Sequence, residues 1–304
     1  MIRLGLVADD LTGACDSALP FLAAGRVVVG LWPEVPVAEG LACAAVSTES
    51  RAEPAPVAFD RSRSAACRLG ADLLYRKLDS MLRGNPAADL AGALDAAGGG
   101  CLVAPALPAE GRVTRGGVQR WPGGELDVRG LLAGLGDRVE VRDAAADAEL
   151  DAVAREALAR GDRVVAGTAG LAAALAGALG LGPPPRAPGP ACRRPLAVVG
   201  SLAAARQAAR ARALGGEVQV LGPAELPSLR PDHDGLVLTG GETAARVLRH
   251  AGAGGLELLG EALPRAPLAR VRGGRLDGLP VVLKAGAFGG DDAVHRALEA
   301  LRAS

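Results

Sequence analysis

The chain has 304 residues, of which 49% are hydrophobic, and its 34 basic and 34 acidic side chains give a formal net charge of +0. A chain of this length can bury a substantial core and suggests about two domains, and the mixed charge argues against intrinsic disorder. The absence of a basic stripe argues against nucleic acid as a partner, and five scattered cysteines argue against a disulfide framework or a zinc site.

The first 180 residues alternate short Val- and Leu-rich runs with Ala-, Leu- and Arg-rich stretches of helical period. Strands are predicted at 2–8, 26–31, 42–47, 72–77, 101–104, 138–141 and 163–167. Helices are predicted at 13–24 and 147–160, each ended by a glycine, and 110–127 is predicted to be a hairpin or a long loop. This alternation predicts an α/β domain with a largely parallel sheet. The N-terminal strand is neither a signal peptide nor a membrane span, so we expect a cytoplasmic protein without a membrane partner.

A Pro- and Gly-rich run at 181–194 interrupts the alternation and is predicted to be an interdomain linker. Strand-like runs return at 196–200, 217–221, 235–240 and 280–286, with helices from about 202, from about 242 and at the C-terminus. The sequence therefore predicts two α/β domains, residues 1–180 and 195–304, with largely parallel sheets and a ligand cleft between them.

Two aspartates, Asp9 and Asp10, follow the first predicted strand in the stretch ADDLTGACD. Ligands bind at the carboxyl ends of parallel strands, so either aspartate could act as general base toward a substrate hydroxyl. The structural alternative is that Asp10 or Thr12 only caps the following helix. The stretch STESR ends in Arg51, whose guanidinium could bind a carboxylate or lie solvated on the surface.

The stretch RKLDSMLRGN, residues 76–85, contains one of the two lysines of the chain and its only asparagine. Nearly every other cation is arginine, so a compact ammonium at Lys77 indicates a nearby anion or hydroxyl that a planar guanidinium would serve less well. Asp79 and Arg83 follow in the same loop. Asn85 before Pro86 predicts a helix N-cap with proline in the first turn.

Three Gly-rich turns follow strands of the second domain: VVGS (198–201), LTGGET (238–243) and LKAGAFGG (283–290). Glycines allow close approach of the backbone to a ligand, and successive N–H groups at a helix start bind phosphate. The second lysine, Lys284, lies in the third turn. Together the turns favour a nucleotide site, and the absence of a Gly-Lys pair excludes a P-loop. The three histidines lack metal-ligand spacing, so no protein metal site is predicted.

These stretches resemble the four-carbon acid sugar kinase family. The matching segments are collinear from residue 8 to about residue 290: ADDLTGACD, VSTESR, RKLDSMLRGN, PALPAEGRVT, GTAGLAAALA, VVGS, LTGGETAARVL and LKAGAFGG. The resemblance implies a two-domain kinase whose N-terminal domain binds an acid sugar and whose C-terminal domain binds ATP, with Mg²⁺ arriving with the nucleotide. Threonate, erythronate and their 3-oxo relatives are the implied small-molecule substrates, and a homo-oligomer is left open.

The motif positions imply the residues of both sites. The acid-sugar site would comprise Asp9, Asp10, Arg51, Lys77, Asp79 and Arg83, with Asp10, or Asp9 beside it, as the base. The ATP site would comprise Ser201, Gly240, Gly241, Glu242, Thr243, Lys284, Gly286 and Gly289.

The chain departs from the family pattern at three places. Met81 stands where the family usually has threonine, LAAARQ follows VVGS in place of further hydroxyl residues, and the region after GRVT is short. The resemblance therefore implies a shortened member. The alternative function is a nucleotide-binding sensor or degenerate kinase without acid-sugar turnover.

Overall fold

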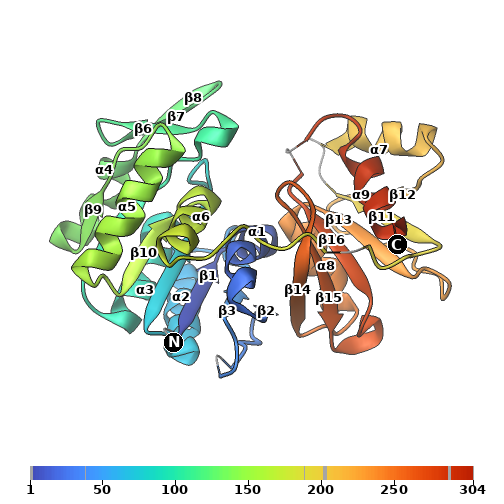
Figure 1. Cartoon of the computed structure of the whole chain (residues 1–304), viewed down its shortest axis with the longest axis horizontal. Helices are drawn as coiled ribbons and strands as arrows, with labels where there is room; N and C mark the ends of the chain where they lie inside the picture. The colour runs from blue at the N-terminus through green and yellow to red at the C-terminus, as the bar shows by residue number, and fades with distance from the viewer. Residues whose placement is uncertain (1–2, 38, 188, 201–203, 287–288, 304) are drawn as a thin grey trace. The chain divides into compact units, whose positions relative to one another are not determined.

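The structure of the protein is a computed structural model that describes residues 3–37, 39–187, 189–200, 204–286 and 289–303. The chain forms two compact units, residues 1–183 and 184–304 (Figure 1). The boundary falls inside the Pro- and Gly-rich run, whose described residues contain no helix or strand beyond an isolated bridge at Arg186. None of the helices in the described ranges is long and apolar enough to cross a membrane.

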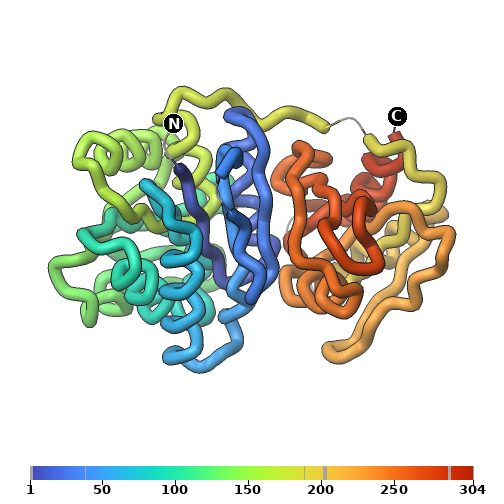
Figure 2. Tube along the Cα trace, turned by 90° about the horizontal axis from the view of Figure 1, so that it is seen from below, coloured from blue at the N-terminus to red at the C-terminus, as the bar shows by residue number. Residues whose placement is uncertain are grey.

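The first unit is built on a parallel sheet. Its strands are β1 (Leu4–Ala8), β2 (Val27–Leu31), β3 (Cys43–Ser47), β4 (Leu73–Lys77), β5 (Cys101–Ala104), β9 (Val139–Val141) and β10 (Val164–Gly167). They lie in the order β2-β3-β1-β4-β10-β5-β9, and every neighbouring pair is parallel. The first strands, blue to cyan in Figures 1 and 2, lie side by side. Each predicted strand of this unit is present, which confirms the α/β prediction.

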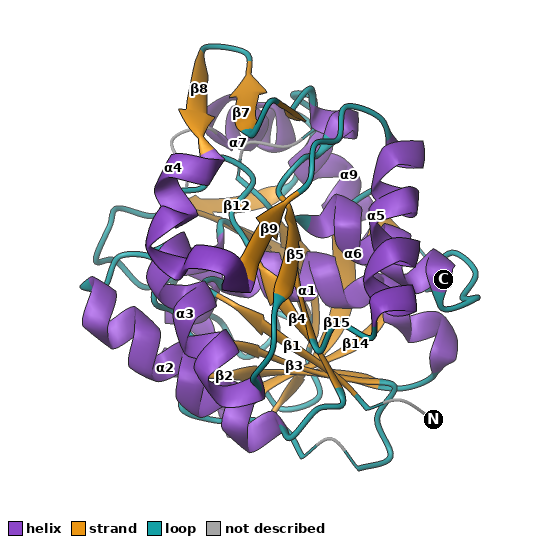
Figure 3. Ribbon diagram, turned by 90° about the vertical axis from the view of Figure 1, so that its left-hand side faces the viewer, coloured by secondary structure: helices purple, strands orange, loops and turns teal. Residues whose placement is uncertain are grey.

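Helices cover both faces of this sheet (Figure 3). They are α1 (Leu11–Ala18), α2 (Ala55–Leu69), α3 (Pro86–Ala97), α4 (Val128–Leu132), α5 (Asp147–Arg160) and α6 (Ala169–Ala178). Leu90 and Leu94 of α3 pack with Leu74 and Val103 of the sheet in one buried cluster. The prediction of a single helix at 13–24 is wrong, because Pro20 cannot donate its backbone nitrogen and the chain tightens into a 3₁₀ helix, Leu19–Ala24.

A small antiparallel sheet stands where a hairpin or long loop is predicted. It consists of β6 (Val113–Arg115), β7 (Val118–Trp121) and β8 (Gly124–Asp127). The turn between β6 and β7 is Gly116–Gly117, with φ of 62° and 79°. Two consecutive positive φ angles favour glycine strongly, which explains the glycine pair in the sequence.

The second unit also has a mainly parallel sheet. Its strands are β11 (Pro195–Val199), β12 (Glu217–Val220), β13 (Gly235–Thr239), β14 (Gly255–Leu263), β15 (Ala266–Arg272) and β16 (Pro280–Lys284), and its helices are α7 (Ala205–Ala213), α8 (Gly241–His250) and α9 (Ala293–Arg302). The order is β12-β11-β13-β16-β15-β14. The antiparallel hairpin β14–β15 is not predicted from the sequence. Its strand residues Gly, Leu and Glu have little β-propensity, and its register shifts at Leu258 and Glu261.

Candidate active site

Asp9 and Asp10 lie at the carboxyl end of β1, where the chain turns into α1. Asp10 is the N-cap residue: its Oδ1 accepts from the Gly13 N–H at 2.9 Å, and its Oδ2 accepts from the Thr12 hydroxyl at 2.9 Å. A Cβ atom at Gly13 would lie 2.4 Å from Asp10 Oδ1 and 3.1 Å from Lys77 Nζ. The predicted capping role of Asp10 is therefore confirmed, and the missing side chain of Gly13 leaves room for both charged groups.

The Arg51 guanidinium binds both aspartates. Its Nε and Nη2 donate to the two oxygens of Asp9 at 2.7 and 2.9 Å, and its Nη1 donates to Asp10 Oδ2 at 3.0 Å. Burial raises the pKa of Asp9, but the charge and hydrogen bonds of Arg51 outweigh it, so the pKa lies below its usual value. The alternative of a solvated surface arginine is wrong. To bind a substrate carboxylate directly, Arg51 would have to lose one of its hydrogen bonds to Asp9 or Asp10.

Asp79 organises the loop that follows β4. It accepts the backbone N–H groups of Met81 and Arg83 at 3.0 and 3.2 Å and two guanidinium hydrogen bonds from Arg83 at 2.9 and 2.7 Å. Arg51 Nη2 is 3.5 Å from Asp79 Oδ1. Burial raises the pKa of Asp79, but the Arg83 and Arg51 guanidinium groups hold it well below its usual range. Asp79 is thus ionised, and Arg83, 60% exposed, covers it from the solvent side.

Asn85 connects this loop to the loop that carries Arg51. Asn85 occupies the N-cap position of α3 with Pro86 in the first turn, as predicted, but its side chain makes no capping hydrogen bond. Instead its Nδ2 donates to the carbonyls of Ser50 and Glu53 at 3.2 and 2.8 Å. The predicted capping role of the side chain is wrong, because its amide is turned toward the neighbouring loop and hydrogen-bonds to the backbone there.

Lys77 is the last residue of β4, and its side chain is buried. Its Nζ donates to the carbonyl of Leu78 at 2.7 Å, and only 6% of the residue is exposed. Within the described ranges it forms no ion pair, although its charge contributes to the low pKa of Asp9. An ammonium has three donors, so most of its hydrogen-bonding capacity is open to a ligand.

Arg112 and Gln119 contact the loop that follows β4, and neither residue is predicted from the sequence to belong to the site. Arg112 donates to the hydroxyl of Ser80, and Gln119 Nε2 donates to the carbonyls of Ser80 and Pro105 at 3.3 and 3.0 Å. Arg112 precedes β6 and Gln119 lies on β7, so the small sheet borders the loop that follows β4. Arg112 lies in PALPAEGRVT, one of the segments that resemble the family, and this resemblance could have indicated it as a site residue.

The second unit repeats the lysine arrangement at the end of β16. Lys284 Nζ donates to the carbonyl of Ala285 at 2.9 Å, and the residue is 4% exposed. Lys284 has no ion pair within the described ranges, and burial lowers its pKa to about 8. A buried ammonium without a counter-charge is costly, which indicates that an anionic ligand supplies the charge.

The amino end of α8 lies beside Lys284. Gly240, with φ of 85°, is the N-cap residue, its N–H donates to the Lys284 carbonyl at 2.9 Å, and no side chain caps the helix within the described ranges. A Cβ atom at Gly289 would lie 3.9 Å from Lys284 Cε, and one at Gly200 would lie 1.9 Å from the hydroxyl of buried Thr243. An uncapped helix start next to a buried cation is a typical phosphate site.

The remaining predicted nucleotide residues differ in position. Gly241 opens α8, Gly286 lies in the turn after β16, and Ser201 lies outside the described residues. The Glu242 side chain is largely exposed, and its Oε1 lies 3.9 Å from Nη1 of Arg246 on the same helix. Its side chain points to solvent on this helix face.

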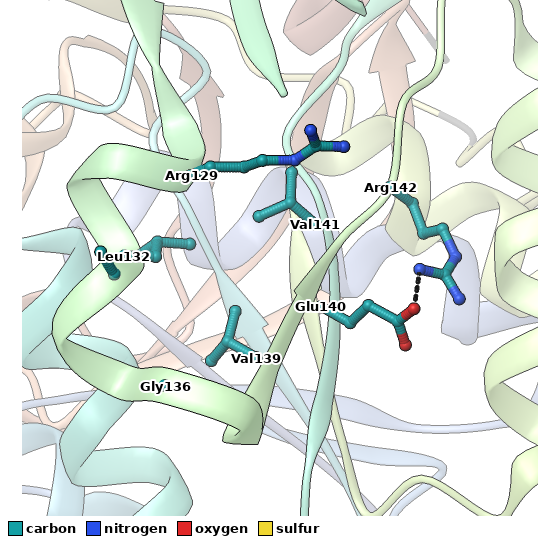
Figure 4. A pocket seen from close by; sticks show the side chains of 8 residues that line it. Arg129, Leu132, Gly136, Val139, Glu140, Val141 and Arg142 are labelled. Carbon is teal, nitrogen blue, oxygen red and sulfur yellow. Dashed lines mark ion pairs between the residues drawn. The ribbon is translucent and has the colours of Figure 1, made fainter. Parts of the chain in front are cut away.

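A cavity of about 300 Å³ lies elsewhere on the first unit, against the edge strand β9 (Figure 4). Its lining consists of Arg129, Leu132, Ala133, Gly136, Val139, Glu140, Val141 and Arg142. The ion pair of Glu140 with Arg142 occupies one side. None of the predicted site residues lines this cavity, so it does not mark the candidate active site.

Comparison with known proteins identifies both units. A sugar-binding N-terminal domain family matches residues 4–129, and a nucleotide-binding C-terminal domain family matches residues 201–294. D-threonate kinase from Bordetella bronchiseptica is 31% identical over 98% of this chain and 97% of its own length. D-threonate kinase from Cupriavidus necator is 30% identical over 98% of both chains. The first alignment has 403 positions against 304 residues here, so at least 99 positions have a residue only in the relative.

Solved structures agree with the fold. A domain of unknown function from Bordetella bronchiseptica, a domain-swapped dimer with bound citrate, is 29% identical with a TM-score of 0.51 over 99% of this chain and 98% of that chain. A Salmonella typhimurium LT2 protein has a TM-score of 0.74 at 19% identity, over 98% of this chain and 99% of that chain. A Haemophilus influenzae protein has a TM-score of 0.71 at 19% identity, over 98% of this chain and 100% of that chain. The last two show the fold alone.

Proposed function

The chain belongs to the four-carbon acid sugar kinase family, and we propose that it transfers the terminal phosphoryl group of ATP to a hydroxyl of a four-carbon sugar acid. D-Threonate is the first candidate, because two relatives similar along nearly their whole length are named D-threonate kinase. The observation that carries the proposal is Lys77, a buried ammonium beside two aspartates with a single protein acceptor. The carboxylate of a sugar acid would supply the direct ion-pair partner that Lys77 lacks.

Asp10 is the better candidate for the general base. Both carboxylates accept hydrogen bonds at both oxygens. Arg51 takes both oxygens of Asp9 and holds the pKa of Asp9 below its usual value, which makes Asp9 a weak proton acceptor. The Asp10 side chain is 12% exposed and that of Asp9 3%. Asp9 would therefore orient Arg51, and Asp10 would accept the proton of the attacking hydroxyl.

The nucleotide would bind at the turns after β13 and β16. The backbone N–H of Gly241 and the ammonium of Lys284 would face its phosphates, while the Gly240 N–H stays bound to the Lys284 carbonyl. Binding of a phosphate anion would raise the pKa of Lys284 from about 8 and keep the side chain charged during the reaction. Ser201, Gly286 and Gly289 remain predicted members of this site.

Mg²⁺ would arrive with ATP. The described residues contain no group of three or more His, Cys, Asp or Glu side chains arranged to hold a metal. The three aspartates of the candidate site, Asp9, Asp10 and Asp79, are already engaged by Arg51 and Arg83. The ion would consequently take most of its ligands from phosphate oxygens and water, as Mg²⁺ commonly does, and it would neutralise charge on the transferred group.

The direct test is turnover. Purified protein would be incubated with Mg-ATP and each stereoisomer of threonate and erythronate and their 3-oxo relatives. ADP would be followed by a coupled assay, and the phosphorylated acid by mass spectrometry. We expect turnover with D-threonate at least, and the Asp10→Asn variant controls for contaminating ATPase. No ADP above that control with any acid would contradict the proposal.

A nucleotide-binding sensor without turnover is the second candidate. The observation that favours it is the absence here of at least 99 positions that the Bordetella bronchiseptica relative has, together with Met81 in the substrate loop. This function predicts saturable ATP binding that depends on Lys284 and no phosphorylated product from any acid. Calorimetry with ATP, with and without the Lys284→Met substitution, separates it from a protein that binds no nucleotide.

Two features of the Bordetella bronchiseptica structure support a carboxylate ligand and a dimer. Its bound citrate is a small hydroxy acid, and its chains form a domain-swapped dimer. We expect this chain to bind a hydroxy acid as well and to form a homodimer in solution, which light scattering after gel filtration would measure.

A further inference from the structure

A buried ion pair lies behind the candidate active site and has no role in the chemistry proposed above. Arg76 precedes Lys77 on β4, and its Nη2 is 2.7 Å from Oδ2 of Asp89 on α3. The two side chains are 1% and 2% exposed. Desolvation of such a pair costs about as much as the attraction returns, and packed apolar residues often serve stability equally well. Stability alone therefore does not account for charges at this place.

The Arg76 guanidinium also holds the strand that leads to Asp9. Its Nη1 donates to the carbonyl of Val7 at 2.6 Å, and Val7 and Arg76 are paired in register between β1 and β4. Val7 stands two residues before Asp9. The Nε of Arg76 is buried without a hydrogen-bond partner within the described ranges. A pair that served stability alone would be expected to satisfy this donor.

The Asp89 carboxylate reaches the loop that carries Arg51. Its Oδ1 accepts from the Ser50 hydroxyl at 3.2 Å. The Thr48 hydroxyl, whose oxygen lies 2.8 Å from that of Ser50, donates its one proton to the Ala8 carbonyl at 2.9 Å, so Ser50 and Thr48 are in contact only. The Ser50 N–H donates to the Asp9 carbonyl at 3.1 Å. One hydrogen-bonded network thus joins α3 to the backbone on both sides of the site.

We propose that Arg76 and Asp89 are positioning residues for phosphoryl transfer, an inference that rests on the function proposed above. The pair holds the end of β1, the start of α3 and residues 48–51 in one geometry, so that Arg51 keeps Asp9 and Asp10 in place when the substrate binds. Both side chains are buried and act through these neighbours. A displacement of a reacting group by about 1 Å costs about 10²-fold in rate, so the network has a measurable effect on turnover.

The test replaces the pair by apolar residues in the full chain, Arg76→Met together with Asp89→Leu. The double substitution leaves no unpaired buried charge, so the fold is expected to persist. We expect kcat with D-threonate to fall about 10²-fold, while the KM for ATP and the Tm stay near their wild-type values. A general loss of structure would instead change all three quantities together.

An exposed ion pair provides a control, because it links β1 and β4 at the ends opposite to Val7 and Arg76. Arg3 precedes β1, Asp72 precedes β4, and Arg3 Nη2 is 2.8 Å from Asp72 Oδ1. The variant Arg3→Met with Asp72→Leu is expected to keep the wild-type kcat. An equal fall of kcat in this control would overturn the positioning role.

The other outcomes are equally decisive. A wild-type kcat in the Arg76→Met, Asp89→Leu variant overturns the inference and leaves the proposed function intact. If that variant does not fold, Arg76→Lys is the substitute, because lysine keeps the charge but lacks the planar guanidinium. The same fall of kcat at a constant KM for ATP is expected for Arg76→Lys. A wild-type kcat in this variant overturns the inference. If the wild-type protein phosphorylates no acid, the proposed function fails, and this inference fails with it.

Discussion

The two lysines of the chain occupy the same kind of position in different surroundings. Lys77 and Lys284 are each the last residue of a strand, each is buried, and each donates to the carbonyl of the next residue. Around Lys77 stand three aspartates and two arginines, linked by ion pairs. Within the described ranges Lys284 has no charged partner, and burial lowers its pKa to about 8.

The site around Lys77 therefore has its charges paired before a ligand binds, whereas the charge of Lys284 would be neutralised only by its ligand. In the first unit the carboxylates of Asp9, Asp10 and Asp79 balance the cations of Arg51, Lys77 and Arg83. Their mutual hydrogen bonds hold the geometry without substrate. In the second unit, phosphate would be the missing counter-charge of Lys284. Each of the following substitutions tests one side of this comparison.

The largest effect is expected at the proposed base. Asp10→Asn keeps the shape and a cap for α1 but removes the proton acceptor, so we expect kcat to fall about 10²–10⁴-fold. ATP affinity, which belongs to the second unit, should not change. Steady-state kinetics with calorimetry for ATP measures both. Asp9→Asn is the matched variant, and a larger loss of kcat there would transfer the role of base to Asp9.

Substitution of Lys77 tests the substrate side of the comparison. Lys77→Met removes the one cation of the site that has no ion pair, and kcat/KM for D-threonate should fall about 10²–10³-fold. Lys77→Arg should not restore it, because the space beside Gly13 fits a compact ammonium and not a planar fork. A weakened ATP affinity with normal use of D-threonate would contradict the assignment.

Substitution of Lys284 should give the opposite result, with weaker ATP binding and a more stable unliganded protein. Loss of a charge-assisted phosphate contact should weaken ATP binding about 10–100-fold. The folded pKa of about 8 lies below the unfolded value of about 10.5, so the unfolded state binds more protons between these pH values. Wild-type stability therefore rises with pH across that window and is lowest below pH 8.

The control for this prediction is the pH dependence itself. At pH 7 the Tm of unliganded Lys284→Met should equal or exceed that of the wild type, and the difference should shrink between about pH 8 and about pH 10. Thermal unfolding at several pH values measures this. A Tm for Lys284→Met well below wild type at pH 7 would show that Lys284 stabilises the empty protein, and the comparison would then fail.

The smallest effect is expected at Asn85. Asn85→Ala removes the side-chain donor of the Glu53 carbonyl and one of the two donors of the Ser50 carbonyl, which should cost about 1–3 kcal/mol in the free energy of unfolding. Asn85→Ser is the matched control, because serine is an equally good N-cap but cannot span to that loop. Denaturant unfolding of both variants distinguishes the roles: wild-type stability in Asn85→Ser would restore the capping interpretation.

Much of the fold is readable from the sequence because it depends on local patterns. The strand at 101–104 is predicted to the residue, since a short apolar run between Gly-rich and Pro-containing turns has few alternatives. The hairpin β14–β15 is missed although its strands are adjacent in sequence, because glycine and glutamate in β14 have little β-propensity and the register of the pair shifts twice. At the site, the residue types are readable from the sequence, but the hydrogen bonds of Arg51 to Asp9 and Asp10 and those of Asn85 to the neighbouring loop are not.

The sequence by itself determined the order of the elements, the strand ends at which Asp9, Lys77 and Lys284 lie, and the family pattern that joins them. Only the tertiary structure decided which charges pair. Side-chain partners such as Arg51 with Asp9, or Arg76 with Asp89, are 42 and 13 residues apart in the chain and meet through parallel strand pairing and helix packing. Local periodicity carries no information about such contacts, because it records which face a residue occupies and not which residue faces it.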